Sequence, residues 1–327
     1  MNDYNTISII PSFSNIKSRE EVDISTTLGP LKLTLPIISA NMRTITGPAM
    51  VNAMCISGGL GILHRFDSIE QNIEDFKTCI NEYELPFNRV GVSIGVNQEG
   101  YSRLDSLMNE HTKIVTIDVA HGHHILVKEM IEHIKKEYDK DIIIIAGNVA
   151  TPDGAYDLFA WGAHIIKVGI GPGFACTTRR NTGVGIPQLE AIQNIREKYS
   201  MPLISDGGIK TVGDIAKTLA IGADGVMVGA ILAGTTETPG KVYPDDSTDL
   251  VNRTFYKVYG GSSSAQNQGE NRFVEGRVQT IPFKGRVKYI LKEIKEGLQS
   301  SFSYCGARNI KEFREKVQFI NVWILLI

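Results

Sequence analysis

Residues 202–230, PLISDGGIKTVGDIAKTLAIGADGVMVGA, contain two short apolar runs joined by an amphipathic stretch. The runs PLISDGG (202–208) and DGVMVGA (224–230) are typical of strands buried on both faces. The segment TVGDIAKTLAIGA between them is typical of a helix. A strand, a helix and a second strand in this order form a parallel βαβ unit, so the stretch predicts an α/β fold with a parallel sheet.

The same alternation extends over most of the chain. Six further apolar runs precede this unit: LPIISA (35–40), GLGILH (59–64), RVGVSIGV (89–96), KIVTIDVA (113–120), DIIIIAG (141–147) and AHIIKVGI (163–170). Amphipathic segments such as HILVKEMIEHIKKEY separate most of them. Eight strands with seven or eight intervening helices predict a closed (β/α)8 TIM barrel. An open doubly wound sheet is the alternative, but no spare edge strand and no GxGxxG after the first run support it.

Residues 252–285 depart from this alternation of apolar and amphipathic segments, because they are rich in Gly, Ser, Asn and Gln and show no long apolar period. A loop of this length in a compact domain is usually functional. It follows the eighth strand on the active-site side, so we expect a mobile flap over about residues 258–285. The helical segment 284–302 is expected to close the barrel after it. We predict one barrel domain over residues 1–327 with no inserted second domain.

Composition narrows the classes of partner. The formal net charge of -2 disfavours nucleic-acid binding, which usually needs a strongly positive surface. The amino terminus lacks the basic start and apolar run of a signal peptide, and the apolar residues 322–327 are too few to span a bilayer. The cysteines are Cys55, Cys79, Cys176 and Cys305. None of them forms a CxxC pair, and their spacings do not indicate a zinc site. We therefore expect a cytoplasmic protein without a nucleic-acid or membrane partner.

Polar side chains follow most of the predicted strands. They are Asn41, His64, Arg65, Asn97, Asp118, Asn148 and Asp206. The active site of a TIM barrel lies at the carboxyl ends of its strands, so these residues are candidates for chemistry. Asn and Asp are also common turn formers, so a purely structural role remains an alternative for each of these residues considered alone.

The loop GIGPGFACTTR (169–179) carries the candidate nucleophile, Cys176. Its three glycines and its proline allow unusual backbone dihedrals and a close approach to a ligand. A thiol on such a loop can be exposed and activated by nearby donors. The alternative is a small buried residue in a turn, and the loop alone does not decide between them.

A second pattern indicates a phosphate-bearing ligand. Small residues follow the seventh and eighth strands, where backbone N–H groups can surround a phosphate: Gly207, Gly208, Gly229 and Ala230. Asp206 can accept hydrogen bonds from ribose hydroxyls. The alternative is that these glycines only form tight turns. FMN-dependent barrels use the same device, so the pattern does not choose a reaction.

Two further groups are candidates for proton transfer. Asp118 and His121 lie in TIDVAHGHH, and Glu275 lies in the expected flap, from which a carboxylate can enter a closed site. Each has a structural alternative, namely an acceptor for the next loop or an exposed flap charge. A metal site in HGHH is disfavoured, because no carboxylate at helical spacing completes a ligand set.

The motifs together resemble those of the IMP dehydrogenase and GMP reductase family. GIGPGFACTTRRNTGVGIPQL (169–189) resembles the catalytic-cysteine loop of the family, and SDGGIKTVGDIAKTLAIGADGVMVGAILAG (205–234) resembles its phosphate-binding segment. IDVAHGHH, IAGNVATP and SANM also look like family motifs. The similarity runs from about residue 6 to residue 320.

Three features favour the reductase branch of the family. The chain lacks the paired regulatory insertion of most dehydrogenases, TGVG follows the cysteine loop, and the flap is short. The resemblance then implies NADPH-dependent reductive deamination of GMP to IMP and ammonia. The alternatives are an IMP dehydrogenase without its regulatory domain and a purine-nucleotide-binding protein with weak catalysis.

The resemblance also implies roles for residues. Cys176 attacks C2 of the purine and forms a covalent thioimidate, and Thr178 and Glu275 assist proton transfer to the leaving amine. The ribose, phosphate and base contacts fall on Asp206, Gly207, Gly208, Gly229, Ala230, Tyr259, Gly261, Ser262 and Ser263. The nicotinamide contacts fall on Asp118, Ala120 and Asn148. The carbonyls of Gly171, Gly173 and Cys176 match a potassium-binding loop, and the family forms homotetramers.

The chain departs from the family pattern at three positions. Phe174 stands where the family often has Ser, Gly261 replaces the Met of a Gly-Met pair, and Ala230 stands where Ser is common. Each lost polar contact costs about 0.5–1.5 kcal/mol. We expect these changes either to weaken nucleotide affinity or to mark an altered specificity, and they leave the nucleophile in place.

Overall fold

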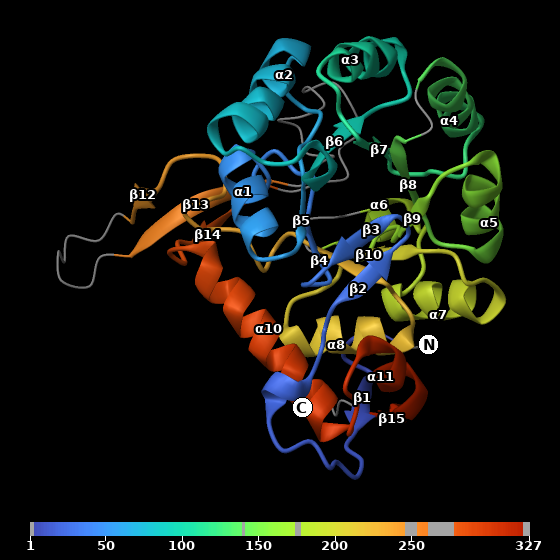
Figure 1. The fold of residues 1–327 in the computed structure, drawn as a ribbon, viewed down its shortest axis with the longest axis vertical. Helices are drawn as coiled ribbons and strands as arrows, with labels where there is room; N and C mark the ends of the chain where they lie inside the picture. The colour runs from blue at the N-terminus through green and yellow to red at the C-terminus, as the bar shows by residue number, and fades with distance from the viewer. Residues whose placement is uncertain (1–2, 139–140, 174–177, 246–253, 261–277, 323–327) are drawn as a thin grey trace.

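Eight parallel strands close into a barrel in the computed structural model, which describes residues 3–138, 141–173, 178–245, 254–260 and 278–322 (Figure 1). The predicted TIM barrel is thus confirmed. Its strands are β4 (Ile37–Ser39), β5 (Leu60–Ile62), β6 (Val90–Ile94), β7 (Ile114–Asp118), β8 (Ile143–Val149), β9 (Ile165–Val168), β10 (Leu203–Asp206) and β11 (Gly225–Val228). The barrel closes where β11 pairs with β4, in the register Val226 to Ile37.

Helices follow the strands, and most of them form the outer layer of the barrel (Figure 1). They are α1 (Pro48–Ile56), α2 (Ile69–Lys77), α3 (Gln98–Asn109), α4 (Ile125–Glu137), α5 (Pro152–Trp161), α6 (Thr178–Thr182), α7 (Gln188–Lys198), α8 (Val212–Ile221), α10 (Val287–Tyr304) and α11 (Ile310–Lys316). Short 3-10 turns span Arg19–Glu21 and Phe87–Arg89, and a π turn spans Thr78–Glu82. Helix α8 begins at a capping box, in which Thr211 and Asp214 bond each other's backbone N–H groups.

The continuous apolar runs are explained by burial on both strand faces. Every residue of β4, β5, β6, β9 and β11 is buried, as expected for a sheet covered by helices. A glycine brings a helix close to the sheet, since a Cβ on Gly61 of β5 would lie 2.6 Å from Cα of Val51 in α1.

A hairpin covers the amino-terminal end of the barrel. Strands β2 (Thr26–Leu28) and β3 (Leu31–Leu33) pair antiparallel, and their leucines are buried. A Cβ on Gly29 in the turn would lie 3.3 Å from the backbone oxygen of His164 and 3.5 Å from the ring of Pro202. Both residues come just before a barrel strand, so the hairpin closes the end opposite the candidate site.

The two terminal segments lie side by side. Strand β1 (Ile7–Ile10) pairs antiparallel with β15 (Gln318–Asn321), and Val322 N–H donates to the carbonyl of Thr6. The pairing was not expected from sequence, because it joins segments more than 300 residues apart. Residues 323–327 of the apolar carboxyl terminus lie outside the described residues.

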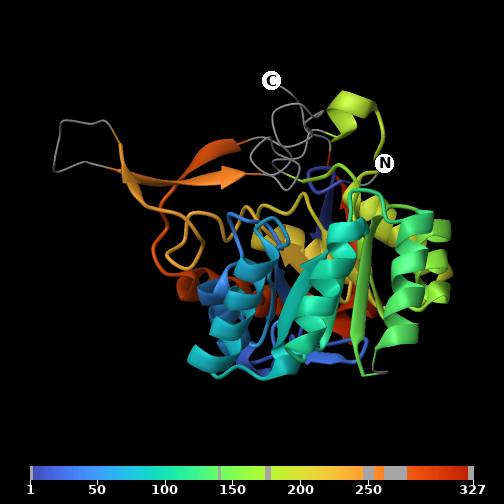
Figure 2. The same ribbon diagram turned by 90° about the horizontal axis from the view of Figure 1, so that it is seen from above.

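The ends of the expected flap form an antiparallel ribbon. Strands β12 (Tyr243–Pro244), β13 (Phe255–Gly260) and β14 (Val278–Pro282) make a three-stranded sheet that extends away from the barrel (Figures 1 and 2). The flap expected over residues 258–285 therefore begins and ends in strands that the sequence reading missed. Residues 261–277 lie outside the described residues.

A buried ammonium group anchors this ribbon. The Nζ atom of Lys257 donates to the carbonyls of Thr235 at 2.9 Å and Thr238 at 2.5 Å. These carbonyls follow β11, so the ribbon is tied to the end of the eighth barrel strand. In the part of the chain that the structure describes, no helix has the length and apolar character needed to cross a membrane.

Replacing Phe302 should destabilise the fold strongly. Phe302 of α10 is fully buried and stacks on Phe313 of α11 with 3.9 Å between ring centroids. We expect Phe302→Ala to lower the free energy of unfolding by about 3–5 kcal/mol, measured by urea denaturation. Tyr304→Ala, on the exposed side of the same helix, is the matched control and should change it by about 0.5 kcal/mol or less. Equal losses in both variants would contradict this packing.

Candidate active site

A buried lysine joins two of the predicted site residues at the carboxyl end of the barrel. Lys167 lies in β9 and is 2% exposed. Its Nζ atom is 3.0 Å from Oδ1 of Asp118, which ends β7, and 3.0 Å from Oδ2 of Asp206, which ends β10. One cation therefore connects the ends of three strands.

The charges of this cluster support one another. Burial disfavours the charged form of Lys167, but the carboxylates of Asp206 and Asp118 outweigh it and raise the pKa of the ammonium. Burial disfavours the ionised form of Asp118 and acts to raise its pKa. The cations of Lys167 and Arg65 outweigh this effect, so the pKa of Asp118 is lowered. Lys167 is therefore protonated and Asp118 ionised at neutral pH.

Asn148, which was also predicted as a strand-end site residue, belongs to the same cluster as Asp118 and Asp206. Its amide nitrogen donates to the carbonyl of Gly169 at 2.7 Å and to Oδ2 of Asp206 at 3.0 Å. Its Oδ1 atom is buried and has no hydrogen-bond partner among the described residues. A buried amide oxygen without a donor is costly, so this atom is a candidate acceptor for a ligand N–H group.

The first part of the cysteine loop packs against the segment that follows β10. A Cβ on Gly169 would lie 2.0 Å from the backbone oxygen of Asp206, and one on Gly207 would lie 2.9 Å from the ring of Pro172. Gly207 and Gly208 have φ values of +105° and +82°, which favour glycine. The glycines expected for ligand contact thus also allow the two loops to approach each other.

The ribbon brings Tyr259 to the end of β11. Its hydroxyl lies 3.5 Å from the position of a Cβ on Gly229 and 4.0 Å from the sulfur of Met42. Burial raises the pKa of Tyr259 to about 12, and the nearby Asp206 carboxylate adds to the shift. Tyr259 is therefore a neutral hydroxyl between the ribbon and the phosphate-binding segment predicted after β11.

The remaining predicted residues fall into three groups. Ala120 is exposed just beyond β7, and Thr178 is the first residue of α6, where its carbonyl accepts a hydrogen bond from Thr182. Gly229 and Ala230, which follow β11, are half-buried, and so are Gly171 and Gly173. The predicted residues outside the described part of the chain are Cys176, Gly261, Ser262, Ser263 and Glu275.

Sequence reasoning missed Lys167 and Gln188. The amide nitrogen of Gln188 donates to the carbonyl of Val168 at 2.7 Å and to the hydroxyl of Ser205 at 2.8 Å, which joins β9 to β10. The available signal for Lys167 was a cation within the apolar run AHIIKVGI. A lysine on a strand buried on both faces needs an anionic partner, and two strand-end aspartates were already candidates.

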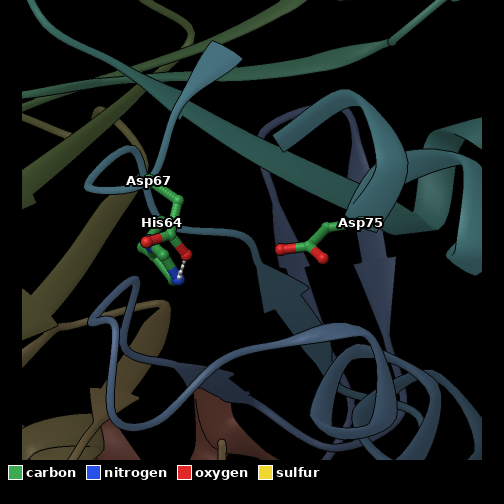
Figure 3. Close-up of side chains that lie close together, drawn as sticks. All are labelled: His64, Asp67 and Asp75. Atoms are coloured by element: carbon green, nitrogen blue, oxygen red, sulfur yellow. Dashed lines mark ion pairs between the residues drawn. The ribbon is translucent and has the colours of Figure 1, made fainter. Parts of the chain in front are cut away.

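A second polar cluster follows β5. His64, Asp67 and Asp75 each offer a ligand atom within 4.8 Å of the others (Figure 3). Phe66 N–H donates to Nδ1 of His64 at 3.2 Å, which places the ring proton on Nε2, facing Asp67 at 3.6 Å. Asp67 also pairs with Arg43 at 2.5 Å. The proton on Nε2 and the nearby Arg43 cation both disfavour a metal ion. We therefore interpret this cluster as a structural one that holds the loop after β5.

Two histidines of HGHH also have structural partners. His123 Nε2 lies 2.7 Å from a carboxylate oxygen of Asp157, and His124 Nδ1 accepts from Leu126 N–H at the start of α4. Both contacts orient the loop after β7.

The acid sensitivity of the fold should depend on His64. Burial lowers its pKa from 6.5 to about 4, Arg43 and Arg103 add to this, and Asp67 opposes it. Between these pH values the unfolded chain binds more protons, so the free energy of unfolding falls as the pH falls. His64→Gln should reduce the loss between pH 7 and pH 5 by about 2 kcal/mol, measured by urea denaturation at both pH values. An unchanged loss would show that His64 is not buried in its neutral form.

Comparisons with known proteins agree with this arrangement. The family model described as "IMP dehydrogenase / GMP reductase domain" matches residues 2–323. The chain is 40% identical to a GMP reductase of Streptococcus equi subsp. zooepidemicus over 322 residues, which cover 98% of this chain and 94% of that protein. It is 37% identical to a GMP reductase of Mesoplasma florum, with 97% of each chain covered.

A solved structure also matches. GMP reductase from Trypanosoma brucei, crystallised in complex with guanosine 5'-monophosphate, superposes with a TM-score of 0.87 at 25% identity, covering 98% of this chain and 95% of that one. The barrel, the strand-end carboxylates and the matches over nearly the whole length lead to one assignment. The chain belongs to the IMP dehydrogenase and GMP reductase family.

Proposed function

We propose that this chain is a GMP reductase, which converts GMP to IMP and ammonia with NADPH as reductant. The observation that carries the proposal is the cluster of Asp118, Lys167 and Asp206 at the barrel rim. It lies in a chain whose GMP reductase relatives align along nearly all of its length. The match to a reductase crystallised with GMP supports the choice of substrate.

The nucleotide is proposed to bind across the ends of β10 and β11. Asp206 accepts hydrogen bonds from the ribose hydroxyls, and Tyr259 donates to the nucleotide. The phosphate is held by backbone N–H groups, because glycine-rich turns after these strands leave them accessible. The proposed donors and flap contacts are Gly207, Gly208, Gly229, Ala230, Gly261, Ser262 and Ser263.

Cys176 is the proposed nucleophile. Its thiolate adds to C2 of GMP, the 2-amino group leaves as ammonia with a proton assisted by Thr178 and Glu275, and a covalent thioimidate remains. Bound NADPH supplies the hydride that reduces C2. The C–S bond then breaks, so IMP departs and the thiolate is restored. The overall reaction takes up two protons for each GMP and releases IMP, NADP⁺ and NH₄⁺.

The proposed nicotinamide site lies beside Asp118, Ala120 and Asn148. The buried Oδ1 of Asn148 has no donor among the described residues, and a carboxamide N–H group would supply one. Asp118 is held by Lys167 and Arg65 on the same side of the rim. These residues orient the reductant but transfer no group themselves.

Other parts of the proposal rest on family resemblance. We propose potassium binding by the carbonyls of Gly171, Gly173 and Cys176, since hard cations prefer oxygen ligands. We also propose a homotetramer in the cytoplasm, with residues 1–327 of each subunit forming a single catalytic domain.

A steady-state assay tests the proposed reaction. Purified protein is mixed with GMP and NADPH, and nicotinamide absorbance, IMP and ammonia are followed. We expect loss of NADPH that depends on GMP, with IMP and ammonia formed in equal amounts. Formation of NADH from IMP and NAD would instead identify a dehydrogenase. No turnover in either mixture, with GMP still bound, would identify a nucleotide-binding protein.

Two substitutions test the proposed chemistry. Cys176→Ala removes the nucleophile, so turnover should be lost while GMP binding, measured by calorimetry, remains. Glu275→Gln should lower kcat about a hundredfold or more, as expected for loss of a proton-transfer group, with a much smaller change in GMP affinity. Turnover by Cys176→Ala would exclude the covalent route. Equal effects of Glu275→Gln on kcat and affinity would make Glu275 a binding residue only.

A further inference from the structure

One buried ammonium group touches both halves of the proposed site. Asp206 is assigned to the nucleotide ribose and Asp118 to the nicotinamide side, and Lys167 bonds both carboxylates at 3.0 Å. We propose that Lys167 is a positioning residue that orients both carboxylates at once, so that nucleotide binding and the reductive step depend on one side chain. This inference rests on the proposed function and extends it to a residue that neither reactant needs to touch.

The hydrogen bonds leave one oxygen of Asp206 for the nucleotide. Lys167 and Asn148 both donate to Oδ2 of Asp206 at 3.0 Å. Among the described residues, none donates to its Oδ1 atom. A carboxylate with one oxygen held by two donors has a defined orientation, and its second oxygen remains as an acceptor. Lys167 and Asn148 together therefore determine the direction in which Asp206 accepts, and Lys167 supplies the charged donor.

Asp118 is held in a similar way from the other side. Lys167 bonds its Oδ1 atom, and Nε of Arg65 lies 3.7 Å from its Oδ2 and donates to its carbonyl at 3.1 Å. The loop after β5 is thereby tied to the end of β7. If Lys167 is removed, Asp118 keeps the longer contact with Arg65 and the side-chain hydrogen bond from Asn41, but it loses the ammonium group at 3.0 Å.

Close packing of β8 against β9 holds the lysine backbone in place. A Cβ on Gly147 of β8 would lie 2.3 Å from the backbone oxygen of Lys167 and 2.7 Å from its Cβ. The absence of a side chain at Gly147 therefore leaves the space that the backbone and Cβ of Lys167 occupy. With its side chain 3% exposed, the ammonium group cannot reach solvent without leaving both carboxylates.

The geometry assigns Lys167 to positioning and not to proton transfer. Both carboxylates stabilise its charged form and raise its pKa, so it retains its proton at neutral pH. The two bonded carboxylate oxygens each lie 3.0 Å from the same nitrogen, which screens their mutual repulsion. Without this cation, two half-buried carboxylates would face each other and reorient toward solvent or take up a proton.

Lys167→Met tests the inference, because methionine keeps much of the stem and removes the charge. GMP affinity is measured by calorimetry, kcat at saturating GMP and NADPH, and stability by urea denaturation. We expect GMP affinity to fall about ten- to a hundredfold, as for loss of a charge-assisted hydrogen bond, and kcat to fall as well. Asp206→Asn should mainly reduce GMP affinity, and Asp118→Asn should mainly reduce kcat.

Double variants separate positioning from simple destabilisation. If Lys167 acts through Asp206, the variant with both Lys167→Met and Asp206→Asn should bind GMP about as weakly as either single variant. Independent effects would multiply instead and would contradict the inference. The same comparison with Asp118→Asn applies to kcat.

Arg196→Met is the matched control at the opposite end of the barrel. Arg196 pairs with Asp224 at 2.7 Å just before β11, so its loss should reduce stability without changing GMP affinity. If Lys167→Met does not fold, the variant with both Lys167→Met and Asp118→Asn restores the charge balance. It should bind GMP at least tenfold more weakly than Asp118→Asn alone.

The outcomes separate this inference from the proposed function. Wild-type binding of GMP, with unchanged affinity and kcat in folded Lys167→Met, would overturn the inference and leave the function standing. Failure of the wild-type protein to bind GMP would overturn the proposed function and this inference together. Reduced affinity and kcat, with non-additive double variants, would support both.

Discussion

The arrangement of the site depends on one buried cation that holds two carboxylates. Lys167 lies in β9, between β8 and β10 in the barrel, and its partners end β7 and β10. An ammonium group inside a barrel is stable only when anions compensate its desolvation, and strand-end aspartates provide that compensation. The same contacts fix the two side chains on which the proposed nucleotide and nicotinamide contacts rest. The stability of the barrel and the proposed function therefore both require that the two carboxylates bond the ammonium group of Lys167.

Close backbone packing surrounds this cluster. Gly147 leaves room for the backbone and Cβ of Lys167, and Gly169 lets the cysteine loop pass the backbone of Asp206. The ribbon contributes Tyr259, while Lys257 ties it to carbonyls that follow β11. Segments that lie far apart in sequence therefore meet at one rim. The opposite end of the barrel is closed by the hairpin β2–β3 and has no part in the proposed chemistry.

The barrel could be predicted because its strands are buried on both faces, which makes them continuous apolar runs. Asp118, Asn148 and Asp206 could be selected as strand-end polar residues, and the structure brings them together around Lys167. Lys167 itself was missed, since a single cation in an apolar run reveals its partners only after the strands are placed in order. The pairing of β1 with β15 depends on contacts between distant segments. Strand β13 was missed because its alternation is short and is followed by glycine-rich sequence.

The central claim is that the chain transfers a hydride to C2 of a guanine nucleotide at this rim. Its most direct test uses NADPH that carries deuterium at the transferred position of the nicotinamide ring, with GMP as substrate. Mass spectrometry and proton NMR then locate the label in the product. The account predicts IMP with deuterium at C2 and loss of the C2 proton signal. IMP formed without the label, or label found in solvent only, would contradict it.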